Sequence, residues 1–328
     1  MPDITVVTRD DIRLTFPCAT SATVLDAAEE AGYYLPSVCH HGRCGTCWAR
    51  VVAGRFELAP YITAALPPTP GSVLLCRCRP RDDLLVELPC RDAQVGRRHV
   101  PERRAVVEAV APPGAAWAGL ALQLLPDAEY GQAAAFTPGQ AMELRIPGSN
   151  MHHSLTMANA PNEAGRLEFL ARPEPGSAFA AWLGAARRGA AVDVRGPAGR
   201  FALDETSPRP RCFAGAGGGL APLLAMLRHL AERRDRTRMQ LIFAANPSEM
   251  SFLEKTLAFL RTALPQLSVT LVPDCPTVMA EVLDAHLARG PRPDIYASGP
   301  PPMLEAVLAA GDARGMPAGQ IRTSVETG

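Results

Sequence analysis

Four cysteines stand at a spacing that can hold an iron–sulfur cluster. Cys39, Cys44 and Cys47 lie in one short loop, and Cys76 follows a long intervening segment. Four residues separate the first two cysteines and two separate the next pair, which is a ligand order of [2Fe–2S] clusters. Two glycines give the loop the backbone freedom to wrap around such a group. We therefore predict a [2Fe–2S] centre held by these four thiolates.

A zinc site is the competing interpretation of the same residues. Cys44 and Cys47, with Cys76 and Cys78, would supply four sulfurs to a tetrahedral ion, but Cys39 would then have no role. A disulfide framework fits less well, because the chain is long, its nine cysteines are odd in number, and it starts without a secretory segment. The cysteines outside the predicted cluster are expected to be free thiols packed as small apolar residues: Cys18, Cys78, Cys90, Cys212 and Cys275.

Length and charge exclude several other classes of protein. With 328 residues the chain is too long for one ordinary core, so two or three domains are expected. Its 33 basic and 33 acidic residues balance, so neither a nucleic-acid surface nor a general attraction to membranes is implied. No apolar run approaches the length of a membrane span. We expect a cytoplasmic protein that binds neither nucleic acid nor membrane.

Residues 1–95 alternate between strand and turn patterns around one helix. Strands are predicted at 4–7, 12–16, 48–52, 73–76 and 84–88, and a helix is predicted at 23–32. Ser21 or Thr23 can cap this helix, and Gly32 can end it. A small sheet with one helix and a cysteine loop predicts a β-grasp ferredoxin domain. The polar segment 94–101 then serves as a linker.

Residues 100–206 read as an antiparallel β-barrel. Short strands separated by glycine and proline are predicted at 104–108, 120–124, 142–146, 167–170 and 191–194. One helix, predicted at 178–183, interrupts them. It is entered through Pro175-Gly176-Ser177, and the free backbone amides at such a helix N-terminus can bind a pyrophosphate.

Residues 207–328 alternate between strand and helix, which predicts a doubly wound parallel sheet. Strand 211–214 leads through the glycine-rich turn 215–219 into helix 220–227, an arrangement that can cradle phosphate. Further strands are predicted at 240–243, 268–272 and 294–298, each followed by a helix. A ligand is expected at the carboxyl ends of these strands.

Together, the three parts resemble the reductase components of bacterial multicomponent oxygenases, most closely the soluble methane monooxygenase reductases. The resemblance covers nearly the whole chain, and its most particular stretches are 136–140, 158–162, 165–170, 196–201 and 298–303. It implies that NADH gives a hydride to FAD and that electrons pass through the [2Fe–2S] cluster to an oxygenase hydroxylase component, of the di-iron type. A flavin is needed because a hydride carries two electrons and an oxygenase metal centre accepts one at a time.

The resemblance also implies the cofactor contacts. The family's flavin motif, Arg-x-Tyr-Ser, falls on His153-Ser154-Leu155-Thr156, so the arginine that neutralises the pyrophosphate and the tyrosine that packs on the ring are both replaced. Thr156 keeps a hydroxyl for the reacting end of the flavin, and Ser298 stands where the family has a cysteine beside the nicotinamide; these two are the implied catalytic positions. The implied flavin contacts are His153, Ser154, Leu155, Thr156, Asn159, Gly176, Ser177 and Ala178, and the implied nicotinamide contacts are Gly217, Gly218, Gly219, Pro222 and Ser298.

Two further departures concern the nicotinamide. No arginine stands in 244–248, where one would pair with a 2′-phosphate, so NADH is favoured over NADPH. The family's terminal Glu-Lys-Phe becomes Ser324-Val325-Glu326, which removes a carboxylate and an aromatic cover. The substitutions in the flavin motif motivate a second hypothesis: a divergent paralogue with an impaired flavin site, acting as a [2Fe–2S] electron carrier or as a regulatory or binding subunit of an oxygenase complex.

Overall fold

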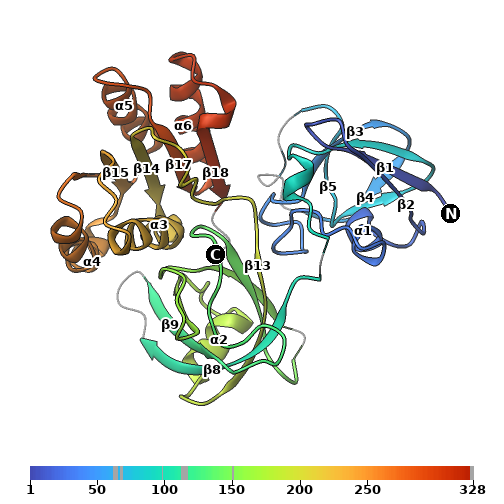
Figure 1. Ribbon diagram of the computed structural model, residues 1–328, viewed down its shortest axis with the longest axis horizontal. Helices are drawn as coiled ribbons and strands as arrows, with labels where there is room; N and C mark the ends of the chain where they lie inside the picture. Colours follow the sequence, from blue (N-terminus) through green and yellow to red (C-terminus); the bar gives the residue numbers. More distant parts are fainter. Residues whose placement is uncertain (62–65, 67–68, 98, 112–116, 150, 326–328) are drawn as a thin grey trace. The chain divides into compact units, whose positions relative to one another are not determined.

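The computed structural model describes residues 1–61, 66, 69–97, 99–111, 117–149 and 151–325. The chain forms two compact units (Figure 1). The first comprises Met1–Glu102 with Ala198–Arg200, and the second comprises Arg103–Pro197 with Phe201–Gly328. Within the described ranges, no helix combines the length and the apolar character needed to cross a bilayer.

The first unit is built on a mixed five-stranded sheet. Its strands are β1 (Asp3–Val7), β2 (Arg13–Pro17), β3 (Trp48–Ala53), β5 (Ser72–Leu74) and β7 (Leu84–Glu87), in the order β2-β1-β7-β3-β5. β1 pairs antiparallel with β2 and parallel with β7. Two short strands, β4 (Phe56–Leu58) and β6 (Cys78–Pro80), form a separate ribbon, and a 3₁₀ turn, η2 (Asp92–Gln94), follows β7.

One helix, α1 (Val24–Glu30), covers the core of this sheet. Thr23 is its N-cap, and the hydroxyl of Thr23 accepts a hydrogen bond from the amide of Asp26. Val24, Leu25 and Ala28 are buried in one cluster with the apolar side chains of the strands. Gly32, with φ +81°, follows the helix. The predicted β-grasp ferredoxin architecture is confirmed, with β4 and β6 as additions.

A six-stranded barrel opens the second unit. Its strands are β8 (Glu102–Ala111), β9 (Ala118–Leu124), β10 (Ala141–Arg145), β11 (His152–Thr156), β12 (Arg166–Ala171) and β13 (Ala191–Ala198). They are ordered β11-β10-β13-β8-β9-β12, and a bridge between Met157 and Phe169 joins the two ends of this order. The helix α2 (Ala178–Ala185) buries Phe179 and Leu183 in the barrel core.

The remaining residues form a parallel sheet with helices on both faces. The strands are β14 (Arg211–Ala216), β15 (Met239–Ala244), β16 (Leu267–Val272), β17 (Asp294–Gly299) and β18 (Ile321–Val325), in the order β16-β15-β14-β17-β18. The helices are α3 (Leu220–Glu232), α4 (Met250–Ala263), α5 (Pro276–Leu287) and α6 (Pro301–Ala313), with 3₁₀ turns η3 (Gly217–Gly219), η4 (Pro247–Glu249) and η5 (Ala318–Gln320).

Successive side chains along each strand point to opposite faces of the sheet, which explains why helices cover both faces. Phe213 on β14 packs with α3 and α4, while its neighbour Cys212 packs with α5 and α6. Figure 1 shows α3 and α4 on one face of the sheet and α5 and α6 on the other. The predicted doubly wound sheet is therefore confirmed, and β18 extends it by one strand.

Candidate functional site

The four predicted cluster ligands come together in the first unit. The Sγ atoms of Cys47 and Cys76 are 3.3 Å apart, and the thiol of Cys44 hydrogen-bonds to Cys39. All four side chains are buried. The sulfurs therefore form two pairs, one within the loop and one between the loop and the segment after β5.

Backbone amides of the loop converge on the first of these cysteines. The amide of Arg43 lies 3.4 Å from the Sγ atom of Cys39, and the amides of His41 and Cys44 also donate to it. The pKa of Cys39 is lowered to about 5, first by the hydrogen bond from Cys44 and then by these amides, against the effect of burial. Donors aimed at a sulfur stabilise its thiolate, which is the form that binds metal.

The geometry fits two irons better than one zinc ion. A cluster with two irons takes two thiolates on each iron, which matches two sulfur pairs. Cys78 is fully buried in the sheet core, and burial raises its pKa to about 12. The zinc alternative, which needs Cys78 as a ligand, therefore receives no support.

A pocket in the second unit lies where the carboxyl ends of the parallel strands meet the barrel. Five of the predicted cofactor residues line it: Leu155, Thr156, Gly218, Pro222 and Ser298. The other lining residues are Leu170, Arg172, Ala221, Ser324 and Val325. Position 326, where the resemblance places the last residue of the terminal motif, is outside the described residues. Both implied catalytic residues, Thr156 and Ser298, thus border the same pocket.

The glycine-rich turn is shaped by its contact with the end of β17. A Cβ atom on Gly219 would lie 1.9 Å from the carbonyl oxygen of Ser298, so only glycine fits there. Gly217 has φ +56°, in the left-handed region. Helix α3 begins directly after this turn, and Ala221 and Pro222 of its first turn line the pocket. The positive end of the helix dipole therefore favours an anionic group at this position.

The predicted pyrophosphate seat lies at the N-terminus of α2, and a histidine packs beside it. The ring of His153 stacks on that of Phe179, with centroids 3.8 Å apart and planes 7° apart. Gly176 has φ +80°, and the hydroxyl of Ser177 accepts from the amide of Ala180. The first amide to bond within the helix is that of Ala181, to the carbonyl of Ser177. The amides of Ala178 and Phe179 therefore precede the helical hydrogen-bond ladder.

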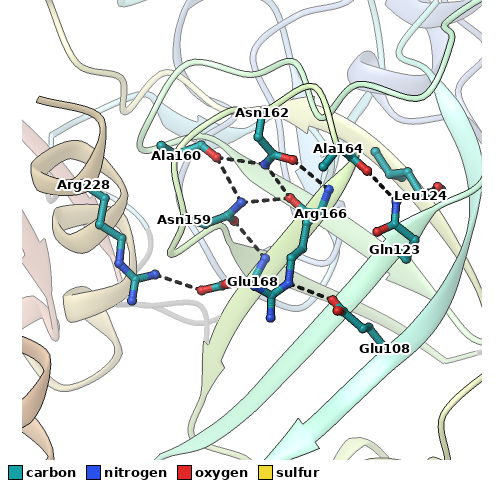
Figure 2. Close-up of polar contacts among 10 residues, drawn as sticks. All are labelled: Glu108, Gln123, Leu124, Asn159, Ala160, Asn162, Ala164, Arg166, Glu168 and Arg228. Atoms are coloured by element: carbon teal, nitrogen blue, oxygen red, sulfur yellow. Dashed lines mark hydrogen bonds and ion pairs between the residues drawn. The ribbon is translucent and has the colours of Figure 1, made fainter. Parts of the chain in front are cut away.

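Asn159 lies in a hydrogen-bonded turn between β11 and β12 (Figure 2). Its Nδ2 donates to the carbonyls of Ala160 and Arg166 at 3.0 and 2.8 Å, and its Oδ1 accepts from the amide of Glu168 at 2.8 Å. The side chain is buried. These contacts give it a role in positioning the turn, and its contribution to flavin binding stays a prediction. Ser154, also buried, stays a predicted contact as well.

Sequence reasoning missed two arginines. Arg172 lines the pocket, and its Nη1 lies 3.3 Å from the buried carboxylate of Glu249. Arg228 on α3 donates to the carbonyl of Ala158 at 3.0 Å. It also pairs with Glu168 at 2.9 Å (Figure 2). The available signal was the place of Arg172 just after the predicted barrel strand 167–170.

Comparisons with known families agree with these parts of the molecule. Residues 7–81 match the 2Fe-2S iron-sulfur cluster binding domain, residues 128–203 the oxidoreductase FAD-binding domain, and residues 213–309 the oxidoreductase NAD-binding domain. The protein is therefore an iron–sulfur flavoprotein that oxidises NADH, with [2Fe–2S], FAD and NADH as its cofactors.

Similarity to named relatives identifies the family to which this protein belongs. The chain is 32% identical to the reductase component of propane 2-monooxygenase from Rhodococcus jostii (strain RHA1), over 91% of this chain and 85% of that one. It is 34% identical to methane monooxygenase component C from Methylosinus trichosporium, over 74% and 72%. The crystal structure of the Amycolatopsis cytochrome P450 reductase GcoB is similar with a TM-score of 0.72 and 27% identity, over 99% and 100%. The chain belongs to the reductase components of bacterial multicomponent oxygenases.

Proposed function

We propose that this reductase delivers electrons from NADH to the hydroxylase component of a di-iron monooxygenase. The observation that carries the proposal is the coexistence of paired cluster sulfurs in one unit and a nicotinamide-type pocket in the other. The propane and methane monooxygenase components among its relatives favour a monooxygenase partner. When bound, FAD supplies the conversion between hydride transfer and single-electron transfer.

The pocket residues have distinct proposed roles. Leu155 offers an apolar surface against which the flavin ring packs, in place of the family's tyrosine. The hydroxyl of Thr156 donates to the reacting edge of that ring, and Ser298, at the end of β17, lies beside the nicotinamide. Gly217, Gly218 and Gly219, with Pro222 behind them, hold the NADH pyrophosphate at the N-terminus of α3.

The flavin pyrophosphate is proposed to lie at α2. The amides that precede the helical ladder at Ala178 and Phe179, in the turn formed by Gly176 and Ser177, are the donors available there. His153 adds a hydrogen-bond donor in place of the family's arginine. Stacking on Phe179 restricts the orientation of its ring. One donor replaces a bidentate guanidinium, so weaker retention of FAD follows.

Three domains are proposed to divide this work. Residues 1–95 carry the cluster, residues 100–206 carry FAD, and residues 207–328 bind NADH. We propose a cytoplasmic location, where NADH is available. A second candidate function, that of an electron carrier or regulatory subunit, is favoured by the replacement of the flavin motif at His153 and Leu155.

The choice of partner can be tested by anaerobic electron transfer. The NADH-reduced protein would be mixed separately with a purified di-iron hydroxylase, a dioxygenase oxygenase component and a cytochrome P450. We expect the di-iron hydroxylase to be reduced fastest, with re-oxidation of the cluster at the same rate. Transfer to the cytochrome P450 or to the dioxygenase component alone would refute the di-iron assignment and leave the reductase assignment intact.

A further inference from the structure

A second cavity lies at the opposite end of the parallel sheet from the nucleotide pocket. It has a volume of about 200 Å³. The amino ends of β14, β15 and β16 border it, together with the segment that follows α5. Its lining residues are Pro210, Arg211, Arg238, Met239, Gln240, Gln266, Ser268, His286, Arg289, Gly290 and Pro291. The cavity is thus built entirely within residues 210–291, and it shares no lining residue with the nucleotide pocket.

The charged residues of this cavity are all basic or potentially basic. Three arginines and one histidine line it, and none of its described lining residues is an aspartate or glutamate. Arg211 is only 2% exposed. Its Nη1 lies 3.2 Å from Asp235, while its Nε has no hydrogen-bond partner among the described residues. Its Nη2 lies 3.5 Å from the carbonyl oxygen of Ser207, so Arg211 contributes a fixed, buried positive charge to the cavity wall.

Neighbouring carboxylates do not cancel the charge of the two exposed arginines. Asp235 is the partner of Arg211, and Asp294 lies 3.6 Å from Arg209. Within the described part of the chain, neither Arg238 nor Arg289 forms an ion pair with a carboxylate. The pKa of His286 is lowered first by burial and then by these same two arginines, so both charges act on the cavity.

The C-terminal end of α5 contributes a partial negative charge to the cavity, and this charge is smaller than the positive charge of the arginines. The helix ends at Leu287, so its last carbonyls lie next to His286 and Arg289. A helix C-terminus is equivalent to about half a negative charge. Two full positive charges exceed this contribution, and the cavity keeps an excess of positive charge.

We propose that this cavity binds a small organic polyanion with at least two phosphate or carboxylate groups. The volume exceeds the space needed for one phosphate and is smaller than that of sites for drug-sized ligands. Arg238 and Arg289 each bind one anionic group, and the buried charge of Arg211 attracts both groups. The exposed hydroxyl of Ser268 adds a neutral donor at the rim.

Calorimetric titration of the FAD-loaded, full-length protein tests this site. Pyrophosphate and citrate would each be added at constant ionic strength, with NAD⁺ saturating so that the nucleotide pocket is blocked. The test variant is Arg238→Gln with Arg289→Gln. The control is Arg236→Gln, which removes an exposed charge of the same loop that does not line the cavity.

We expect saturable binding of one or both probes to the natural protein. The double variant should bind at least tenfold more weakly, because two charge-assisted contacts are lost, and the control should stay within twofold. Preference for pyrophosphate or for citrate would identify phosphate or carboxylate as the bound group. The absence of saturable binding, or equal weakening by the control, would overturn the proposal.

Discussion

The sulfur atoms of Cys47 and Cys76 lie 3.3 Å apart although 29 positions separate these residues in the sequence. The register of the sheet explains this approach. Trp48 on β3 pairs with Leu74 on β5, and the amide of Leu75 donates to the carbonyl of Cys47 at 3.0 Å. Strand pairing thus brings Cys76 next to the three predicted ligands of the cysteine loop.

The sulfur pairing predicts different results at two nearby cysteines. Cys76→Ala should abolish the visible absorption of the cluster and the bound iron and sulfide, because one iron loses a ligand. Cys78→Ala is the matched control and should keep iron and sulfide at the natural level, with about 1 kcal/mol lost from the free energy of unfolding. Metal lost from the Cys78 variant and kept by a Cys39→Ala variant would instead support a zinc site.

The contact between the glycine turn and β17 predicts that Gly219→Ala is severe. The added Cβ would meet the Ser298 carbonyl at 1.9 Å, so the turn or the strand end must move. We expect a loss of about 1–3 kcal/mol in the free energy of unfolding and weaker NAD⁺ binding. Gly184→Ala in α2 is the control, since no atom lies within 4 Å of its added Cβ. Natural NAD⁺ affinity and stability in the Gly219 variant would contradict the account.

The link between α3 and the barrel predicts a measurable coupling energy. Arg228 and Glu168 have side chains 33% and 30% exposed, which places their pair between the surface and buried cases. A double-mutant cycle with Arg228→Met and Glu168→Gln should give about 0.5–1 kcal/mol, measured by denaturant unfolding and decreasing with salt. The more exposed pair of Arg233 and Glu205 is the comparison and should give less. Equal coupling energies in the two pairs would contradict the prediction that the Arg228–Glu168 pair is stronger than a more exposed pair.

The altered flavin motif predicts that restoring the arginine improves FAD retention. His153→Arg, alone or with Leu155→Tyr, should raise the FAD content of the purified protein and its FAD affinity by about tenfold, because a guanidinium binds a pyrophosphate bidentately. His152→Arg is the control, because it adds an arginine at the adjacent position, where the natural histidine pairs with Glu143 at 2.9 Å. Fluorescence titration with FAD measures the effect, and an unchanged affinity would remove this explanation of the motif.

Local pattern was sufficient for most of the fold. Three features could be predicted because their signals lie in adjacent residues. These are the strands bounded by glycine, the helix N-cap at Thr23, and the strand–turn–helix at residues 211–227. The missed strands β4 and β6 have only three residues each. β11 begins with two histidines and lacks an alternating apolar pattern, so its place in the barrel depends on pairing with β10. β18 is likewise defined by its pairing with β17.

In the candidate site too, the residues with a local sequence signal could be predicted, and those defined by distant partners could not. The grouping of the four cysteines could be predicted because three of them lie in one loop and the chemistry of a cluster fixes the spacing. Arg172 and Arg228 were missed because their partners are distant: Glu249 is 77 positions from Arg172, and Glu168 is 60 from Arg228. Asn159 was predicted as a flavin contact from its motif alone, whereas hydrogen bonds reveal its role in the turn.

The most direct test of the reductase function is a cofactor assay on protein purified without added flavin. Iron, acid-labile sulfide and FAD released on denaturation would be quantified, and NADH would then be added anaerobically while the absorption spectrum is recorded. The account predicts two iron atoms and two sulfides per chain, FAD bound as purified or after it is supplied, and bleaching of both chromophores by NADH. A cluster that stays oxidised with NADH, even after FAD is supplied, would contradict it and favour an electron carrier or regulatory subunit.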